Sequence, residues 1–166
     1  MAFNPVQVGG IDTDRYGVKF NADYVWLPNI ANPNGTPTEA EINLGRLLTG
    51  AIAAINGFNV SPRYDELPDL VSTADPKVAA GSSVDDSAIS FYLASDDDDA
   101  LDFFTQGDDG FIVHCPRGLV GLARAYVWKV EASVVLPTVA MTGGSMGAVG
   151  FGTFGAPKKI DLPTET

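Results

Sequence analysis

The stretch ARAYVWKVEASVV, residues 123–135, is the part of the sequence that decides the fold class. Apolar Ala125 and Val127 alternate with their neighbours, as in a strand that buries one face. The alternation becomes irregular from Trp128 to Val130, which indicates a β-bulge. The sequence therefore predicts one long, bulged strand around which the other elements are arranged.

Further strands are expected on both sides of this stretch. Residues 110–115 (GFIVHC) precede it, and residues 147–154 (GAVGFGTF) follow it after a glycine-rich turn at Gly143 and Gly144. Earlier in the chain, residues 87–93 (SAISFYL) alternate between two faces. The 18 Gly and 11 Pro of the chain punctuate it often, which favours short strands and turns over a helical bundle.

The first half of the chain supplies two more apolar segments. Residues 24–27 (YVWL) form the first dense apolar run, and Pro28 ends it. Residues 47–60 (LLTGAIAAINGFNV) are predicted to form strands, because Gly50 and Gly57 interrupt any helical run and several of the side chains are β-branched.

Helical structure is expected at two short places. Thr38 and Glu41 have the spacing of a capping box, which predicts a helical turn ending at Asn43. A second helix is predicted over residues 95–104 (SDDDDALDFF), with its carboxylates at the positive end of the helix dipole and Gly107 ending it.

The remaining segments predict one domain with a long loop and two arms. The length of 166 residues with 45% apolar content fits one hydrophobic core. Residues 61–83 contain several prolines and lack clean periodicity, so we expect a long functional loop. We expect an N-terminal arm at residues 1–23, a β-domain at 24–157 and a C-terminal tail at 158–166. Truncating either arm should leave the domain folded.

The charge of the chain limits its partners. There are 21 Asp and Glu against 10 Lys and Arg, a net charge of −11, which disfavours tight binding of nucleic acid or anionic lipid. No Lys or Arg lies between Lys77 and Arg117, whereas nine Asp do. One region of the fold is therefore expected to carry a strong negative field.

No targeting or membrane segment is expected from the sequence. The N-terminus has no signal-peptide pattern, and no stretch approaches the roughly 20 apolar residues of a membrane span. Cys115 is the single cysteine, so no internal disulfide is needed and synthesis in the cytoplasm fits.

No catalytic, cofactor-binding or metal-binding residue is predicted. Asp96–Asp99 lack the ligand spacing of a calcium loop, and a helix start explains them. His114 and Cys115 are neighbours in a strand and point to opposite faces, so they form no dyad, and they are too few to bind zinc. We therefore expect a protein that is not an enzyme.

The glycine-rich residues 143–155 (GGSMGAVGFGTFG) match neither a phosphate-binding loop nor a dinucleotide fingerprint. A structural role is favoured instead. The glycines at 147, 150 and 152 would let neighbouring backbone approach closely, while Val149, Phe151 and Phe154 would pack.

Several segments, taken in order, resemble the major tail tube proteins of long-tailed bacteriophages, in particular phages of actinobacteria. They are PTEAEINLGRLLTG, FNVSP, ELPDLVS, VDDSAISFYLASDDDDALDFF, DDGFIVHCPRG and AYVWKVEASVVLP, and the likeness spans residues 24–157. The resemblance implies a mainly β fold, a β-sandwich or split barrel with one short flanking helix at residues 96–104, extended terminal arms and a long loop linking rings.

The resemblance also implies a function. Such subunits assemble into rings, expected to be hexameric, that stack into a virion tail tube through which genomic DNA passes without specific binding. The expected partners are copies of the chain and the tail terminator, tape measure and baseplate proteins, with no membrane and no cofactor. An acidic lumen would repel the DNA backbone.

Two other functions remain open from the sequence. One is another self-assembling virion component or an injection-system tube. The other is a soluble β-sandwich binding module in which Trp26, Tyr92, Tyr126 or Trp128 stacks on a ligand. For these aromatic residues, packing in the core or in an interface is the favoured role.

Overall fold

A computed structural model of the chain describes residues 6–7, 22–32, 36–66, 77–93, 100–138 and 146–164. The described residues form a mainly β structure with one short α-helix. The elements, in chain order, are β1 (Val6–Gln7), β2 (Asp23–Leu27), α1 (Glu39–Leu44), β3 (Arg46–Leu47), η2 (Thr49–Ala51), β4 (Ile52–Asn56), β5 (Val60–Glu66), β6 (Lys77–Val84), β7 (Ser87–Tyr92), η3 (Ala100–Phe103), β8 (Asp109–Cys115), β9 (Arg124–Thr138), β10 (Met146–Thr153) and β11 (Lys158–Asp161).

Strand β9 is the centre of the main sheet, whose order is β1-β3-β2-β8-β9-β10-β7-β4 with β11 also paired to β9. The first half of β9 pairs with β8 on one edge and with β11 on the other. Its second half continues along β10. The register shifts where Gly150 lies opposite Val134 and Phe151 opposite Ala132, which leaves Ser133 as a bulge. The predicted long strand is confirmed, but its bulge lies at Ser133 and not at residues 128–130, where the pairing with β8 is regular.

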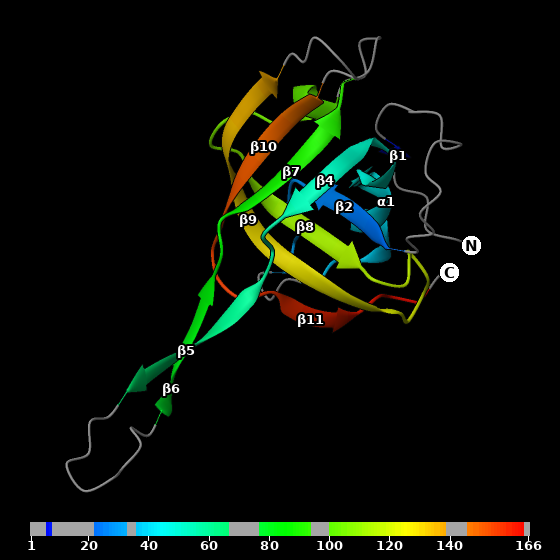
Figure 1. The fold of residues 1–166 in the computed structure, drawn as a ribbon. Coiled ribbons are helices and arrows are strands. Elements are labelled where there is room, and N and C mark those ends of the chain that lie inside the picture. Colours follow the sequence, from blue (N-terminus) through cyan, green and yellow to red (C-terminus); the bar gives the residue numbers. More distant parts are fainter. Residues whose placement is uncertain are drawn as a thin grey trace, which may run out of the picture.

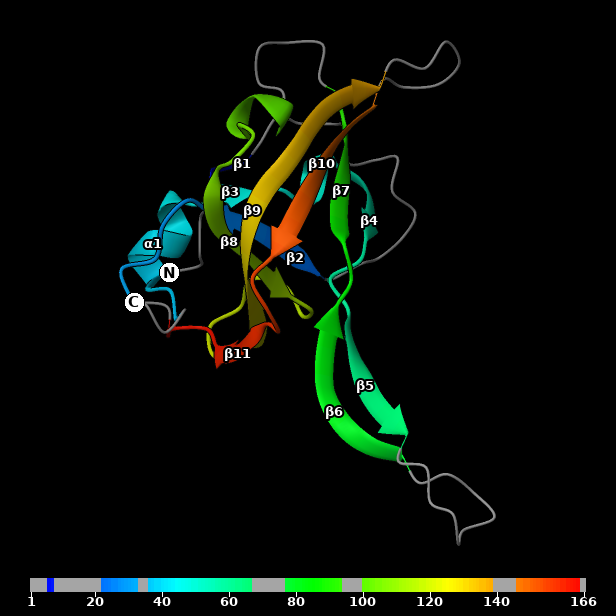
Figure 2. The same cartoon turned by 90° about the vertical axis from the view of Figure 1, so that its left-hand side faces the viewer.

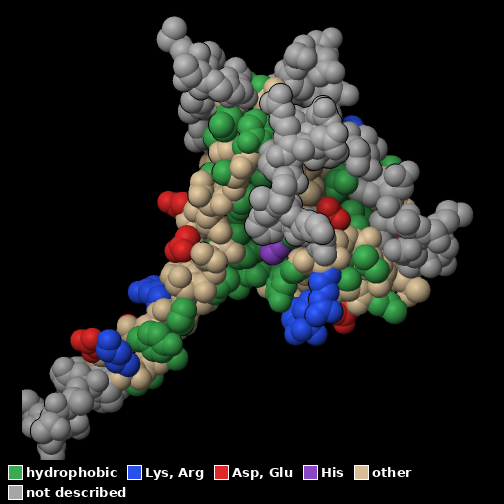
Figure 3. Space-filling model, turned by 45° about the vertical axis from the view of Figure 1, so that its right-hand side comes forward, with side chains coloured by type: hydrophobic (Ala, Val, Ile, Leu, Met, Phe, Trp, Pro, Cys, Tyr) green, Lys and Arg blue, Asp and Glu red, His purple; other side chains and the backbone are tan. Residues whose placement is uncertain are grey.

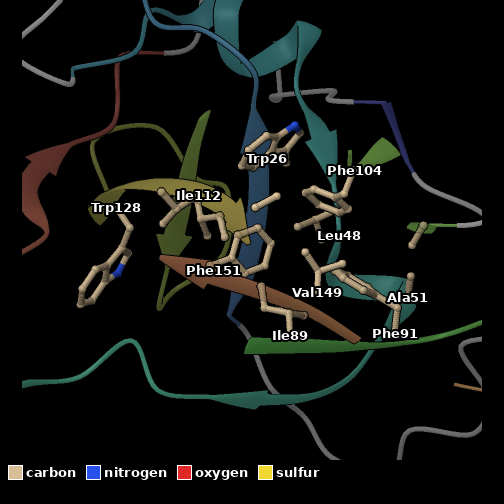
Figure 4. Packing of buried hydrophobic residues seen from close by; sticks show 13 residues of the cluster. Trp26, Leu48, Ala51, Ile89, Phe91, Phe104, Ile112, Trp128, Val149 and Phe151 are labelled. Carbon is tan, nitrogen blue, oxygen red and sulfur yellow. The ribbon is translucent and has the colours of Figure 1, made fainter. Parts of the chain in front are cut away.

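Because the long strand β9 takes part in both halves of the sheet, the sheet forms the two layers of a β-sandwich (Figures 1 and 2). One layer contains β4, β7, β10 and the second half of β9, and the other contains β3, β2, β8 and the first half of β9. The main core fills the space between them (Figure 4). Its fully buried members include Leu48, Ile89, Phe91, Val130 and Val149.

A second core lies on the other face of β2, β8 and β9. Helix α1 and the C-terminal segment contribute to it through Ile42, Ile160 and Leu162, which are all buried. The predicted capping box is confirmed, since the Glu41 N–H donates to Thr38 Oγ1 and the Thr38 N–H donates to the Glu41 carboxylate. These two hydrogen bonds fix the start of the helix that covers this core.

The structure overturns the prediction that residues 61–83 form a loop. β5 and β6 pair antiparallel from Val60 opposite Val84 to Glu66 opposite Lys77, and they form a separate sheet of two strands. Residues 67–76 between them lie outside the described residues. The hairpin projects away from the body in both views (Figures 1 and 2). Since no layer of the described residues covers either face, the sequence shows no alternation of buried and exposed positions.

The predicted tail and the second predicted helix also differ from the structure. Residues 158–161 form β11, and Leu162 is 1% exposed, so this part of the tail belongs to the core. Of the helix predicted at 95–104, residues 100–103 form a 3-10 turn and residues 94–99 lie outside the described part of the chain. Most of the predicted arm at 1–23 also lies outside it, although Val6–Gln7 pair with β3 and Asp23 begins β2.

Candidate assembly surfaces

One layer of the sandwich turns an uncharged face to solvent. We call β4, β7, β10 and residues 132–138 of β9 the open half-sheet. Its three strands IAAIN, SAISFY and MGAVGFGT contain no charged residue. Ile89, Phe91 and Val149 point into the core. The opposite face carries small or neutral side chains, all exposed or half-exposed: Ala54, Asn56, Ala88, Ser90, Ala148 and Gly150.

Both edges of the open half-sheet lack a strand partner among the described residues. On one side β4 is the last strand, with a register shift that leaves Ala53 as a bulge. On the other side of the half-sheet, β8 and the residues just before it pair with β9 only as far as Ala132, whose N–H donates to the carbonyl of Asp108. Successive strands are antiparallel, so β4 and β9 run in opposite directions.

The hairpin is the second surface of note, because its two faces differ in chemistry. One face carries Val60, Pro62 and Tyr64 of β5 opposite Val84, Ser82 and Ala79 of β6. Val60 is 41% exposed, and Tyr64 is 58% exposed. At its far end Lys77 and Glu66 form an ion pair of 3.4 Å. An isolated two-stranded hairpin is marginally stable in water, so such an apolar face favours a packing partner.

The adjacent residues His114 and Cys115 point to opposite faces, as predicted. Cys115 is fully buried, and burial raises the pKa of its thiol to about 12, with Asp23 adding to the shift. His114 points to the other face of β8, where its ring lies between two tyrosine rings. It stacks on Tyr24 with the ring centres 4.6 Å apart, and the ring centre of Tyr126 is 6.1 Å away. Burial lowers the pKa of His114. We therefore expect the thiol to be unreactive, and the imidazole packs between the two tyrosine rings.

The described aspartates of the acidic region do not lie on the face of the open half-sheet. Asp85 and Asp86 lie in the turn between β6 and β7, Asp102 lies in η3, and Asp108 and Asp109 lie at the start of β8. Asp96–Asp99 lie outside the described residues. Within the described part of the chain, no three His, Cys, Asp or Glu side chains are grouped as for a metal ion.

The glycine-rich segment packs closely, in part as predicted. A Cβ at Gly147 would lie 2.1 Å from Leu101 Cδ1, so η3 rests directly on this glycine. Val149 and Phe151 are buried, as expected. The packing predicted for Phe154 is wrong, because this side chain is 57% exposed and lies beside Lys129, whose Nζ is 4.9 Å from the ring centre.

Of the aromatic residues considered for ligand stacking, Trp26 and Trp128 are buried, whereas Tyr92 and Tyr126 are half-buried. Trp26 and Trp128 are 4% exposed and contact other aromatic rings, Phe104 and Phe58 respectively. Both side chains pack in the core, which is the role that the sequence favoured for them.

Sequence reasoning missed the two open edges and the hairpin, since strand pairing and its absence are not encoded in local periodicity.

The comparisons with known proteins identify the family. The model of the phage tail tube protein family matches residues 17–140 of the chain. The chain therefore belongs to the phage tail tube protein family. It is a structural subunit of the tail tube and is located in the virion tail.

Solved structures confirm the fold. One is the extended sheath–tube complex of an extracellular contractile injection system, PVC, with TM-score 0.55, 9% identity, and coverage of 90% of this chain and 95% of that chain. Another is the six-fold symmetrised baseplate of the anti-feeding prophage, with TM-score 0.55, 7% identity, and coverage of 92% and 99%. No curated protein sequence matches the chain. Among the described helices, none is long and apolar enough to cross a membrane.

Proposed function

We propose that copies of this subunit close into rings of six through the edges of the open half-sheet, and that the rings stack into a conduit for DNA. The observation that carries the proposal is the pair of oppositely directed edges at β4 and β9, neither of which has a strand partner among the described residues. When β4 of one copy lies beside β9 of the next, the sheet continues antiparallel without interruption. Edge pairing of this kind uses backbone hydrogen bonds.

A ring is the expected product of this contact. The surface at β4 differs from the surface at β9, so the contact is heterologous and closes if the rotation per copy permits. The six-fold symmetrised baseplate of the anti-feeding prophage, which contains this fold, supports six copies. Ring closure also removes the exposed edges, which otherwise promote aggregation.

The outward face of the open half-sheet would then line the lumen. Its described side chains are uncharged, so DNA phosphates would meet no Lys or Arg that could hold them. This wall is neutral, which differs from the acidic lumen considered from the sequence. Passage of DNA would depend on the absence of binding groups more than on repulsion.

The hairpin supplies a second contact between copies. Its apolar face, formed by Val60, Pro62 and Tyr64 on β5, is covered by no described layer of its own subunit. Packing of this face on a second copy would bury aliphatic and aromatic surface, which stabilises the contact by about 25 cal/mol per Å².

The proposed contacts with tail terminator, tape measure and baseplate proteins lie at the ends or inside of the finished tube. None of these contacts requires a catalytic step.

Cross-linking of paired cysteines tests ring closure. Asn56 on β4 and Ser133 on β9 are both exposed, so the variant Asn56→Cys/Ser133→Cys places one thiol at each edge. A short bifunctional maleimide should give a ladder of covalent oligomers that ends at six. The native Cys115 should not react, because it is buried with a pKa of about 12.

The single variant Asn56→Cys is the matched control, and it should remain monomeric on a denaturing gel. Hollow tubes or rings in electron micrographs of the wild-type protein should accompany the ladder. Uniform small particles at every concentration, together with no ladder from the double variant, would contradict the proposal.

A further inference from the structure

The hairpin continues two strands of the body. β4 leads into β5 and β6 leads into β7, so one antiparallel pair of segments runs from the open half-sheet into the hairpin. Asn56 lies opposite Ala88 on the body side, and Val60 lies opposite Val84 on the hairpin side. Each segment has three residues between these pairs, so the register is the same on both sides. We call this interruption of the ladder, residues 57–59 and 85–87, the elbow.

Two successive left-handed residues interrupt the ladder at the elbow. The backbone φ is +78° at Gly57 and +55° at Phe58. Glycine adopts this conformation freely, whereas phenylalanine rarely does. A Cβ at Gly57 would lie 2.7 Å from Ser87 Cα, so the two segments approach closely here. An unfavourable conformation such as that of Phe58 persists only where surrounding contacts enforce it.

The hydroxyl of Ser87 ties the two segments together. The Phe58 N–H donates to Ser87 Oγ at 2.8 Å, and Ser87 Oγ donates to the Asp85 carbonyl at 3.2 Å. Ser87 is the one buried polar side chain among the described residues, at 4% exposed. Because a backbone N–H that is shielded from water needs an acceptor, this hydroxyl takes the place of a backbone carbonyl across the bend.

The ring of Phe58 fixes the bend to the body. It is half-buried and packs edge-on against Trp128 with the ring centres 5.5 Å apart, and the ring centre of Phe151 is 6.2 Å away. On the hairpin side, the Asp85 N–H donates to the Asn59 carbonyl at 3.3 Å and resumes the ladder. The elbow is therefore held to the core on one side and to the hairpin on the other.

The direction of the hairpin depends on this elbow. Beyond Val84 at its base, neither face of the hairpin packs on another described element. In the space-filling view its described strands leave the body as a narrow arm (Figure 3). From these observations we infer that the elbow is a latch that aims the hairpin in the free subunit, and that Ser87 is its positioning residue.

A latch of this kind would favour assembly. Association is opposed by the entropy lost when a segment is ordered, and a segment that already has one direction loses less. This consequence rests on the proposed function, in which the hairpin contacts a second copy. The aim of the hairpin within one free subunit does not depend on that function.

Distances measured between spin labels on the free subunit test the latch. The variant Ser82→Cys/Glu131→Cys places one exposed thiol on the hairpin and one on β9, and buried Cys115 should not take the label. At concentrations where the protein is monomeric, electron–electron resonance should give one narrow distance distribution. Adding Ser87→Ala should widen the distribution about twofold or more, because one of the two hydrogen bonds across the bend is lost.

Two further variants separate aiming from folding. Ser90→Ala removes a hydroxyl from the same strand outside the elbow and should leave the distribution narrow. Phe58→Gly removes both the ring and the strain, so it should widen the distribution, and it decides the inference if Ser87→Ala does not fold. A purely structural role for Ser87 would lower stability to urea without widening the distances. Narrow distances in folded Ser87→Ala, or wide distances before any change at the elbow, would overturn the inference.

The same variant tests the consequence for assembly. Ser87→Ala should raise the concentration needed for tube formation about threefold or more, since a loosely aimed hairpin must be ordered on binding. An unchanged concentration together with widened distances would overturn the role of the latch in assembly. The cysteine ladder distinguishes the two proposals, because its absence contradicts ring closure and leaves the distances in the free subunit unaffected.

Discussion

The body and the hairpin of this subunit are both made of paired strands, but different interactions stabilise them. In the body, β7 and β10 bury Ile89, Phe91 and Val149 against a second layer. In the hairpin, every residue of β5 and β6 is exposed or half-exposed, and the two strands pair only with each other. The body has the core that folding requires. The hairpin has the exposed surface that the proposed assembly would use.

The largest effect should come from opening the main core. Phe91 is fully buried and packs against Phe104 with ring centres 5.8 Å apart. Phe91→Ala should lower the free energy of unfolding by about 3–5 kcal/mol, measured by urea denaturation, because it removes buried area and leaves a cavity. The matched change in the hairpin, Tyr64→Ala, should stay within about 0.5 kcal/mol. Equal losses would contradict the division into two regions.

The C-terminal segment should behave as part of the body. Leu162 is 1% exposed and lies in the second core beside Ile42 and Ile160. Leu162→Ala should cost about 2–5 kcal/mol of unfolding free energy. A loss near zero would restore the earlier expectation of a dispensable tail, and thermal denaturation monitored by circular dichroism would decide between these outcomes.

A smaller effect is expected at the start of α1. Thr38→Ala removes the side chain that accepts from the Glu41 N–H and donates to the Glu41 carboxylate. The expected cost is about 1 kcal/mol, as for other N-cap substitutions. Thr38→Ser keeps the hydroxyl and should retain most of the stability, so equal losses from both variants would exclude capping as the cause.

The smallest effect concerns pH. Burial lowers the folded pKa of His114 below the ordinary value of 6.5, so the unfolded chain binds the proton more readily. Stability should therefore be constant at higher pH and fall as the pH drops through about 6.5 towards the folded pKa. His114→Phe preserves packing between Tyr24 and Tyr126 and should flatten this part of the pH profile. If the His114→Phe variant keeps the same slope of stability against pH, the loss of stability at low pH comes from the carboxylates and not from His114.

The parts of the fold that the sequence predicts are those in which one strand face is buried. Residues 87–93 and 110–115 alternate, and both form strands of the body. The hairpin was mistaken for a loop because, beyond Val84 at its base, neither of its faces packs on another described element. β11 was missed because Lys158 and Lys159 dominate its composition. The burial of Ile160 depends on α1 and β2, which lie far away in the sequence.

The candidate surfaces were predictable to a lesser extent. Resemblance to tail tube proteins predicted self-assembly, and the family match confirms the class. The free edges at β4 and β9 could not be predicted, since an edge is defined by the strand that does not pair there.

Replacing the hairpin tests the comparison most directly. Asn59 and Asp85 already lie side by side, with the Asp85 N–H donating to the Asn59 carbonyl at 3.3 Å, so an Asn-Gly turn can join Ser61 to Ser83 in place of residues 62–82. We expect a folded monomer with nearly wild-type stability to urea and no tubes in electron micrographs. An unfolded protein, or normal tubes, would contradict the assignment of folding to the body and assembly to the hairpin.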